Sequence, residues 1–250
     1  MQQRFLLITP GRSGSTHLRA TLNSIEGLLL KDEVFNRSHH DEESFNRYLD
    51  KKWHRKLLGS VSNRESLSTS PLNFTLSGLV NGFINDLINT NSKEEYLGFT
   101  VSLDQWYAYP QIHAHIADWK LIYLTRKDLL RLTLSLMKAR TSGNYEMPDD
   151  RVVELDPQLV EDHIALYEEW ESGFLEGVKP DLILHYEDLF ENYSNSVKSI
   201  VQLLEMKAAE YTISGLEKVN HSESGRWVAN LEEIKDYLSK SSKIGFEIKD

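Results

Sequence analysis

The sequence predicts an α/β protein in which a central, mostly parallel sheet is flanked by helices. Short apolar runs typical of buried strands alternate along the chain with longer stretches of helical spacing. The first apolar run, residues 5–8, leads into a glycine-rich loop and then into a helical stretch. No internal repeat or low-complexity tract interrupts the alternation, so we expect residues 1–250 to form a single domain.

The composition is that of an ordinary globular chain of 250 residues, with 40% hydrophobic and 26% charged residues. A net charge of −10 argues against a general nucleic-acid binder, which usually presents a basic face. The absence of cysteine excludes disulfides and thiolate metal sites. The first apolar run is too short for a signal peptide, and no run approaches the ~20 residues of a membrane span, so we expect a cytoplasmic protein.

The strands are predicted from short runs rich in Leu, Ile, Val, Phe and Tyr that end at polar or turn residues. The first of them stops at Thr9-Pro10-Gly11, and the second, Leu28-Leu29-Leu30, ends in Lys31-Asp32-Glu33. In chain order we expect strands at residues 5–8, 28–30, 96–101, 120–125 and 181–186.

The helices are predicted from apolar residues that recur every three or four positions, most clearly between Leu76 and Ile88. Asp128 is a predicted N-cap for the helix that begins after it. After the helix that follows the first loop, we expect helices over 41–57, 76–88, 129–137, 158–176, 196–204 and 228–238. The polar stretches between them are expected to be loops, at 59–73 (a candidate flap), 141–157 and 219–227.

The loop after the first strand has the composition of an anion cradle. Glycines allow the backbone to approach a ligand closely, hydroxyls and Arg12 supply donors, and the first turn of the helix offers free N–H groups. A nucleotide-binding Walker loop would require glycine and lysine where Thr16 and His17 stand. The alternative is a tight turn without a ligand. The candidate ligands are Gly11, Arg12, Ser13, Gly14, Ser15 and Thr16.

Two further polar groups follow predicted strands. In a parallel sheet the carboxyl ends of the strands share one edge, where ligands bind. Arg126 comes directly after the strand 120–125, where a guanidinium is a suitable phosphate clamp, and Glu33 follows the second strand. Taken alone, Glu33 is simply a solvated loop carboxylate and Ser135, two turns into its helix, a neutral surface residue.

Taken together, these stretches resemble the sulfotransferases that use 3′-phosphoadenosine-5′-phosphosulfate (PAPS), with a P-loop-like three-layer fold. The resemblance is to the bacterial carbohydrate branch that includes trehalose and nodulation-factor sulfotransferases. The stretches that carry it are Pro10–Thr16, Glu33-Val34-Phe35, Leu97-Gly98-Phe99, Leu124–Asp128 with Ser135, Tyr186-Glu187-Asp188-Leu189, and Arg226-Trp227 to Asn230.

The resemblance implies that PAPS is the donor and that 3′,5′-adenosine bisphosphate (PAP) is the product. The loop 11–16 would hold the 5′-phosphosulfate, and Arg126 with Ser135 would hold the 3′-phosphate, with Arg226 near the adenosine. Glu33 matches the position of the general base, and Arg12 would stabilise charge on the leaving phosphate oxygen. No metal is expected. The acceptor is expected to be a small molecule or glycan, and a homodimer is an assembly that the sequence leaves open.

The sequence also departs from the family pattern. Thr100 stands where many relatives have lysine, and His17 stands where they have an apolar residue. Lys31 or Lys127 could substitute for the missing lysine. Two alternatives therefore stay open, a non-catalytic nucleotide-binding relative and an ATP-dependent P-loop kinase. Trp106, Tyr107 and Tyr109 are either packing residues or an aromatic floor for a sugar or a base.

Overall fold

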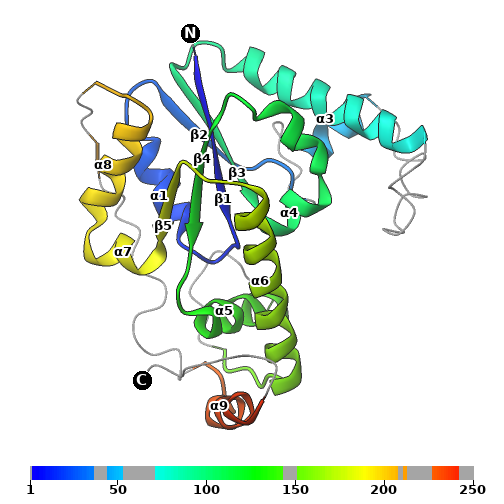
Figure 1. Cartoon of the computed structure of the whole chain (residues 1–250), viewed down its shortest axis with the longest axis vertical. Coiled ribbons are helices and arrows are strands. Elements are labelled where there is room, and N and C mark those ends of the chain that lie inside the picture. The colour runs from blue at the N-terminus through cyan, green and yellow to red at the C-terminus, as the bar shows by residue number, and fades with distance from the viewer. Residues whose placement is uncertain are drawn as a thin grey trace.

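A computed structural model describes residues 2–36, 44–52, 71–142, 151–207, 211–212 and 227–241 (Figure 1). Its strands are β1 (Gln3–Thr9), β2 (Leu28–Glu33), β3 (Tyr96–Ser102), β4 (Lys120–Thr125) and β5 (Leu182–His185). Its helices are α1 (Ser15–Leu22), α2 (Phe45–Lys52), α3 (Pro71–Thr90), α4 (Leu103–Ala108), η3 (Pro110–His115), α5 (Leu129–Ser142), α6 (Pro157–Gly177), α7 (Tyr186–Glu191), α8 (Tyr193–Leu203) and α9 (Leu231–Lys240).

The five strands form one sheet in the order β2-β3-β1-β4-β5, and every pair of neighbours is parallel. The prediction of a parallel α/β sheet is therefore confirmed. The chain moves from β1 to one side of the sheet for β2 and β3, and then crosses to the other side for β4 and β5. This reversal creates a topological switch point between β1 and β4, where open α/β sheets bind their ligands.

Both faces of the sheet are covered by helices, which explains why its strands are apolar at successive positions. In β1, Phe5 and Leu7 face a cluster built with α1 and α8, whereas Leu6 and Ile8 face a cluster built with α3, α4 and η3. All four side chains are fully buried. The alternation of strand side chains thus divides the interior into two cores.

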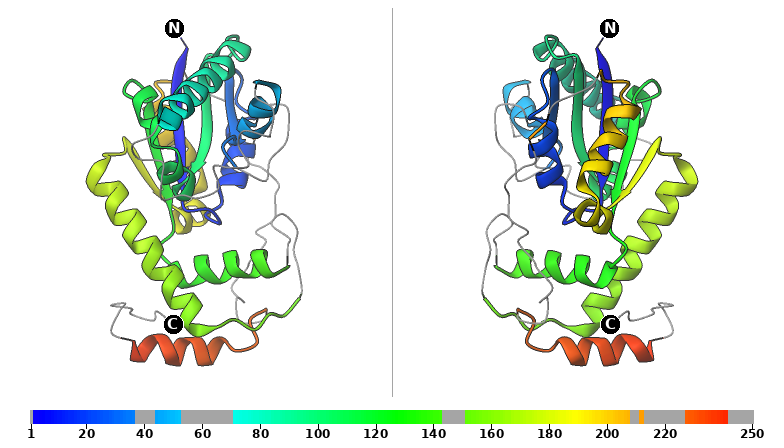
Figure 2. Two further views of the ribbon diagram at one scale, coloured as in Figure 1. Left: turned by 90° about the vertical axis from the view of Figure 1, so that its right-hand side faces the viewer. Right: turned by 90° about the vertical axis from the view of Figure 1, so that its left-hand side faces the viewer.

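A third apolar cluster lies beyond the carboxyl ends of the strands, among α5, α6 and α9 (Figures 1 and 2). It contains Leu134 of α5, Ile164 of α6 and Ile234 of α9. Val153 and Val228 form an isolated parallel bridge there. Because α6 extends from this cluster up to the sheet, it connects the third cluster to the edge where the predicted ligands gather (Figure 1).

The loop prediction for residues 59–73 is wrong at its end, because α3 begins at Pro71. Proline at the first helical position loses no hydrogen bond, so it can begin a helix as well as interrupt one. The helix predicted from residue 228 begins three residues later in the structure, at Leu231, because Val228 pairs with Val153. Asp128 is confirmed as an N-cap, since its carboxylate accepts a hydrogen bond from the Arg131 N–H at 2.8 Å.

The remainder of the flap, residues 41–43 and 53–57 of the helix predicted over 41–57, and positions 143–150 and 213–226 lie outside the described residues. None of the described helices combines the length and the apolar character needed to cross a bilayer. Within the same residues, no group of His, Asp or Glu is arranged to hold a metal ion.

Candidate functional site

The loop between β1 and α1 is curled by three residues in the left-handed region. Gly11, Arg12 and Gly14 have φ values of 81°, 51° and 84°. Positive φ is rare for arginine and costs energy, so its presence marks a backbone conformation that the surroundings enforce. Successive turns of this kind, next to the free N–H groups at the start of α1, form a concavity suited to an anion.

The loop is held from beneath by β1. Thr9 and Ser13 are both fully buried, and their hydroxyls are hydrogen-bonded to each other. The Gly11 N–H donates to Thr9 Oγ1 at 3.3 Å. The Ser13 hydroxyl therefore stabilises the loop itself. Ser15 is half-buried and Thr16 is exposed in the first turn of α1, where side chains can meet a ligand.

The structure brings together three of the predicted phosphate ligands, although they are far apart in the sequence. Arg12 Nε donates to Ser135 Oγ at 3.2 Å. Arg126 Nη1 donates to the Arg12 carbonyl oxygen at 3.4 Å. Ser135 is only 6% exposed, so it faces this junction and is not the surface residue of the alternative prediction. The loop after β1 and the residues after β4 thus form one basic junction at the switch point.

Arg126 is a buried cation that receives no direct counter-ion from the described part of the chain. Its side chain is 8% exposed, and its Nε has no hydrogen-bond partner in the structure. Among the described residues, no carboxylate forms an ion pair with it. Burial lowers the pKa of the Arg126 guanidinium, while the more distant charges of Asp128 and Glu187 act in the opposite direction. A buried guanidinium in this state is well matched to a phosphate, which supplies charge and acceptors together.

Tyr186 supports both halves of this junction. The Arg126 guanidinium carbon lies 4.4 Å from the centroid of the Tyr186 ring. A Cβ added to Gly14 would lie 3.1 Å from the same ring, so the loop can approach it only because residue 14 is glycine. Sequence reasoning missed this role, although the Tyr-Glu-Asp-Leu segment that contains Tyr186 was part of the resemblance.

The next two residues of that segment fix the turn that carries Arg126. Glu187 accepts hydrogen bonds from the Lys127 N–H at 3.1 Å and from the Asp128 N–H at 3.3 Å. Asp188 forms a 3.1 Å ion pair with the Lys127 ammonium. The Lys127 side chain is therefore directed toward α7. It does not substitute for the family's lysine at position 100.

Glu33 ends β2, at the edge of the sheet. Its Oε2 accepts hydrogen bonds from Asn36 Nδ2 at 2.8 Å and from Gln105 Nε2 at 3.1 Å. Because β2 is separated from β1 by β3 alone, the end of β2 lies roughly 10 Å from β1. Thr100, on the intervening strand, is 1% exposed and donates to the Lys31 carbonyl oxygen at 3.2 Å.

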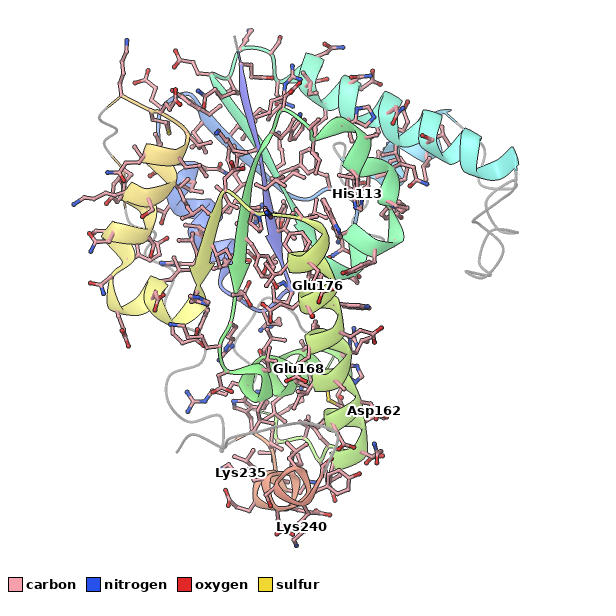
Figure 3. The ribbon with its side chains drawn as sticks, in the orientation of Figure 1. His113, Asp162, Glu168, Glu176, Lys235 and Lys240 are labelled. Atoms are coloured by element: carbon pink, nitrogen blue, oxygen red, sulfur yellow. The ribbon has the colours of Figure 1, made fainter. Side chains whose placement is uncertain are left out.

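Of the two alternatives for the aromatic residues near β3, packing in the core is the one that holds for Trp106 and Tyr109. Trp106 is 2% exposed and stacks on His113, on η3 (Figure 3), and Tyr109 is 8% exposed and packs on Phe35. Only Tyr107 is substantially exposed, and its hydroxyl donates to the Trp170 carbonyl oxygen at 2.8 Å. The sequence could not separate these residues, because α4 and η3 turn two of them into the core.

The second departure from the family pattern, His17, is a packing residue, and the predicted adenosine ligand Arg226 is not described. His17 lies in α1, with its ring 4.8 Å from the ring of Tyr193, and burial lowers the pKa of its imidazole. It is therefore a neutral packing group at neutral pH. Arg226 falls outside the described residues, and Trp227 beside it is buried, with the Lys138 ammonium 4.9 Å from its ring.

Comparison with solved structures identifies the fold. A sulfotransferase domain from the curacin biosynthetic pathway aligns over 100% of this chain and 94% of its own, with a TM-score of 0.56 and 17% identity. A sulfotransferase from Alicyclobacillus acidocaldarius aligns over 97% of this chain and 94% of its own, with a TM-score of 0.51 and 10% identity. No family model and no curated protein matches the sequence. The chain thus has the fold of these sulfotransferases.

Proposed function

We propose that the protein transfers a sulfuryl group from PAPS to an acceptor hydroxyl and releases PAP. The observation that carries this proposal is the junction of Arg12, Arg126 and Ser135, in which no described residue accepts a hydrogen bond from Arg126 Nε. The groups of this junction come from the loop after β1 and from the residues after β4, which suits the two separate phosphates of a 3′,5′-bisphosphate, whereas a triphosphate would not need the second group. The shared fold of two sulfotransferase structures supports the same reading.

In this proposal different residues bind the 5′-phosphosulfate, the 3′-phosphate and the adenosine of PAPS. The curled loop, residues 11–16, holds the 5′-phosphosulfate through its N–H groups and hydroxyls. Arg126 and Ser135 hold the 3′-phosphate, and the resemblance to the family assigns Arg226 to the adenosine. Tyr186 fixes the position of Arg126 relative to the loop, because Gly14 of the loop and the Arg126 guanidinium both pack on its ring.

PAPS supplies the sulfuryl group: its sulfur–oxygen bond to phosphate breaks as a bond from sulfur to the acceptor oxygen forms. Glu33 takes the proton of the acceptor hydroxyl as general base. Arg12 and the loop N–H groups stabilise the negative charge that develops on the leaving phosphate oxygen. The reaction needs no metal, because the groups that neutralise this charge belong to the protein.

The proposed acceptor is a carbohydrate hydroxyl. This choice is supported by the resemblance to the carbohydrate branch. Trp106 and Tyr109 add no support, because both are buried and cannot stack on a sugar. Phenols, lipids and peptides carry the same reacting group and belong in the test panel.

Calorimetric titration with PAP tests the donor class. We expect Arg126→Ala to weaken PAP binding at least tenfold, because it removes the buried cation proposed to hold the 3′-phosphate. The control is Arg151→Ala, which removes an exposed arginine and should leave PAP binding unchanged. Failure of the wild-type protein to bind PAP contradicts the proposal, and ATP-dependent phosphoryl transfer would revive the kinase alternative.

A second candidate function, nucleotide binding without catalysis, is favoured by Thr100, whose buried hydroxyl supplies no cation at the usual lysine position. A transfer assay from labelled PAPS to trehalose, a chitin oligosaccharide and a simple phenol separates the two. On the proposed function, Glu33→Gln lowers kcat about a hundredfold or more and leaves PAP binding intact. Tight PAP binding without transfer to any acceptor would establish the binding-only function.

A further inference from the structure

The pairing of β2 with β3 shifts register just before Glu33. Lys31 pairs with Phe99 and Glu33 pairs with Thr100, so two steps along β2 match one step along β3. An irregularity of this kind is a β-bulge, and bulges re-aim side chains near functional sites. The orientation of the Glu33 carboxylate must then be set by the groups that it meets beyond the strand.

The first such group comes from the turn that follows. The Asn36 N–H donates to the Glu33 carbonyl oxygen at 2.8 Å, which closes a turn over residues 33–36. The turn brings the Asn36 side-chain amide back onto Glu33 Oε2, at 2.8 Å. Backbone and side chain of Asn36 therefore both bind the same residue.

The second group comes from a different strand and helix. Gln105 occupies the third position of α4, and its Oε1 accepts a hydrogen bond from the Ser102 N–H at 3.3 Å. An amide whose oxygen faces an N–H must turn its NH₂ the other way. Gln105 Nε2 accordingly donates to Glu33 Oε2 at 3.1 Å, from a side chain that is only 6% exposed.

We propose that Gln105 and Asn36 are positioning residues that fix the carboxylate of Glu33 for its work as a base. Two amides on one oxygen, Oε2, set the plane of the carboxylate and therefore the place of Oε1. Both donors favour the charged carboxylate, the form that can accept a proton. This inference rests on the proposed function for the role of Glu33, but the clamp itself can be tested without catalysis.

Charged groups from the elements around the clamp bear on that test. The hydroxyl of Tyr167 in α6 is affected by the charges of Arg140 of α5, Asp104 of α4 and Glu33, so charges in this part of the molecule act over more than direct contact. A change in the charge of residue 105 must therefore be compared with the same change elsewhere in the molecule.

The test is to follow the titration of the Glu33 carboxyl carbon by NMR in protein labelled at glutamate, with Glu33→Gln to assign the signal. In Gln105→Glu the new carboxylate can still accept from the Ser102 N–H, so the start of α4 is kept. The donor to Glu33 is replaced by a negative charge, and we expect the midpoint of the Glu33 titration to rise by about one pH unit or more. Gln105→Leu, which removes the donor without adding charge, should raise it by a smaller amount.

The matched control is Gln202→Glu, an exposed position on α8, which packs on β5 at the opposite edge of the sheet from β2. It should leave the Glu33 titration unchanged. An unchanged Glu33 midpoint in both Gln105 variants overturns the clamp, whether or not the protein transfers sulfuryl groups. If the midpoint moves but Glu33→Gln keeps full transfer activity, the clamp stands and the proposed base is wrong.

Discussion

Gly98, in the middle of β3, shows how a single residue decides the packing of the central strands. A Cβ at this position would lie 2.5 Å from the ring of Phe5 on the neighbouring strand. Since Phe5 is fully buried, its ring cannot move away freely. We expect Gly98→Ala to lower the free energy of unfolding by about 1–3 kcal/mol, measured by urea denaturation, because it overpacks the core.

The same substitution at Gly78 is the control. Gly78 lies in α3, and a Cβ there would meet nothing within 4 Å. Alanine in an open helical position should raise the free energy of unfolding by about 0.5–1 kcal/mol, since it restricts the unfolded chain. Equal effects of the two substitutions would show that the Phe5 contact does not matter.

At the scale of elements, α6 is fastened to the end of β4. Glu171 Oε1 accepts hydrogen bonds from the hydroxyls of Tyr123, at 2.9 Å, and Thr125, at 2.5 Å. Tyr123 is 1% exposed, so Glu171→Ala would leave a buried hydroxyl without its acceptor. We expect this change to lower the free energy of unfolding by about 1–3 kcal/mol, measured by urea denaturation.

A matched change on the same helix separates this contact from loss of a surface charge. Glu176 is exposed near the sheet end of α6 (Figure 3), and its change to alanine should stay within about 0.5 kcal/mol. A comparable loss in both variants would contradict the role given to Glu171.

At the scale of the whole molecule, buried tyrosines limit stability at alkaline pH. Burial raises the pKa of Tyr167 to about 12, and it raises the pKa of Tyr123 and Tyr193 as well. Above pH ~10 the unfolded chain releases these phenolic protons while the native protein keeps them. The unfolded state then binds fewer protons, so the free energy of unfolding falls as pH rises from about 10, and Tyr167 alone accounts for about 2–3 kcal/mol by pH 12.

Urea denaturation between pH 8 and pH 11 measures this loss. Tyr167→Phe should flatten the decline above pH 10, because it removes one of the ionising groups, and it should leave the pH dependence below 9 unchanged. A decline as steep as that of the wild-type protein would assign the alkaline loss to other groups.

The features predicted correctly from the sequence are those determined by interactions between residues that are close together in the chain. The apolar runs at β1 and β4 predict strands because buried parallel strands need apolar residues at successive positions. Glycines 11 and 14 predict a loop that can approach a ligand closely, and both adopt the positive φ that glycine favours. Pro71 shows where this reasoning fails, since one proline can end a loop by starting a helix.

By itself, the sequence determined the alternation of strands and helices, the loop at residues 11–16, and the location of Arg126 and Glu33 at strand ends. Only the tertiary structure decided that Arg12 reaches Ser135, that Tyr186 lies under both Gly14 and Arg126, and that Gln105 contacts Glu33. The reason is physical. Local propensity and apolar periodicity depend on residues that are neighbours in the sequence. These contacts depend on the spatial order of the strands in the sheet, which brings distant segments together.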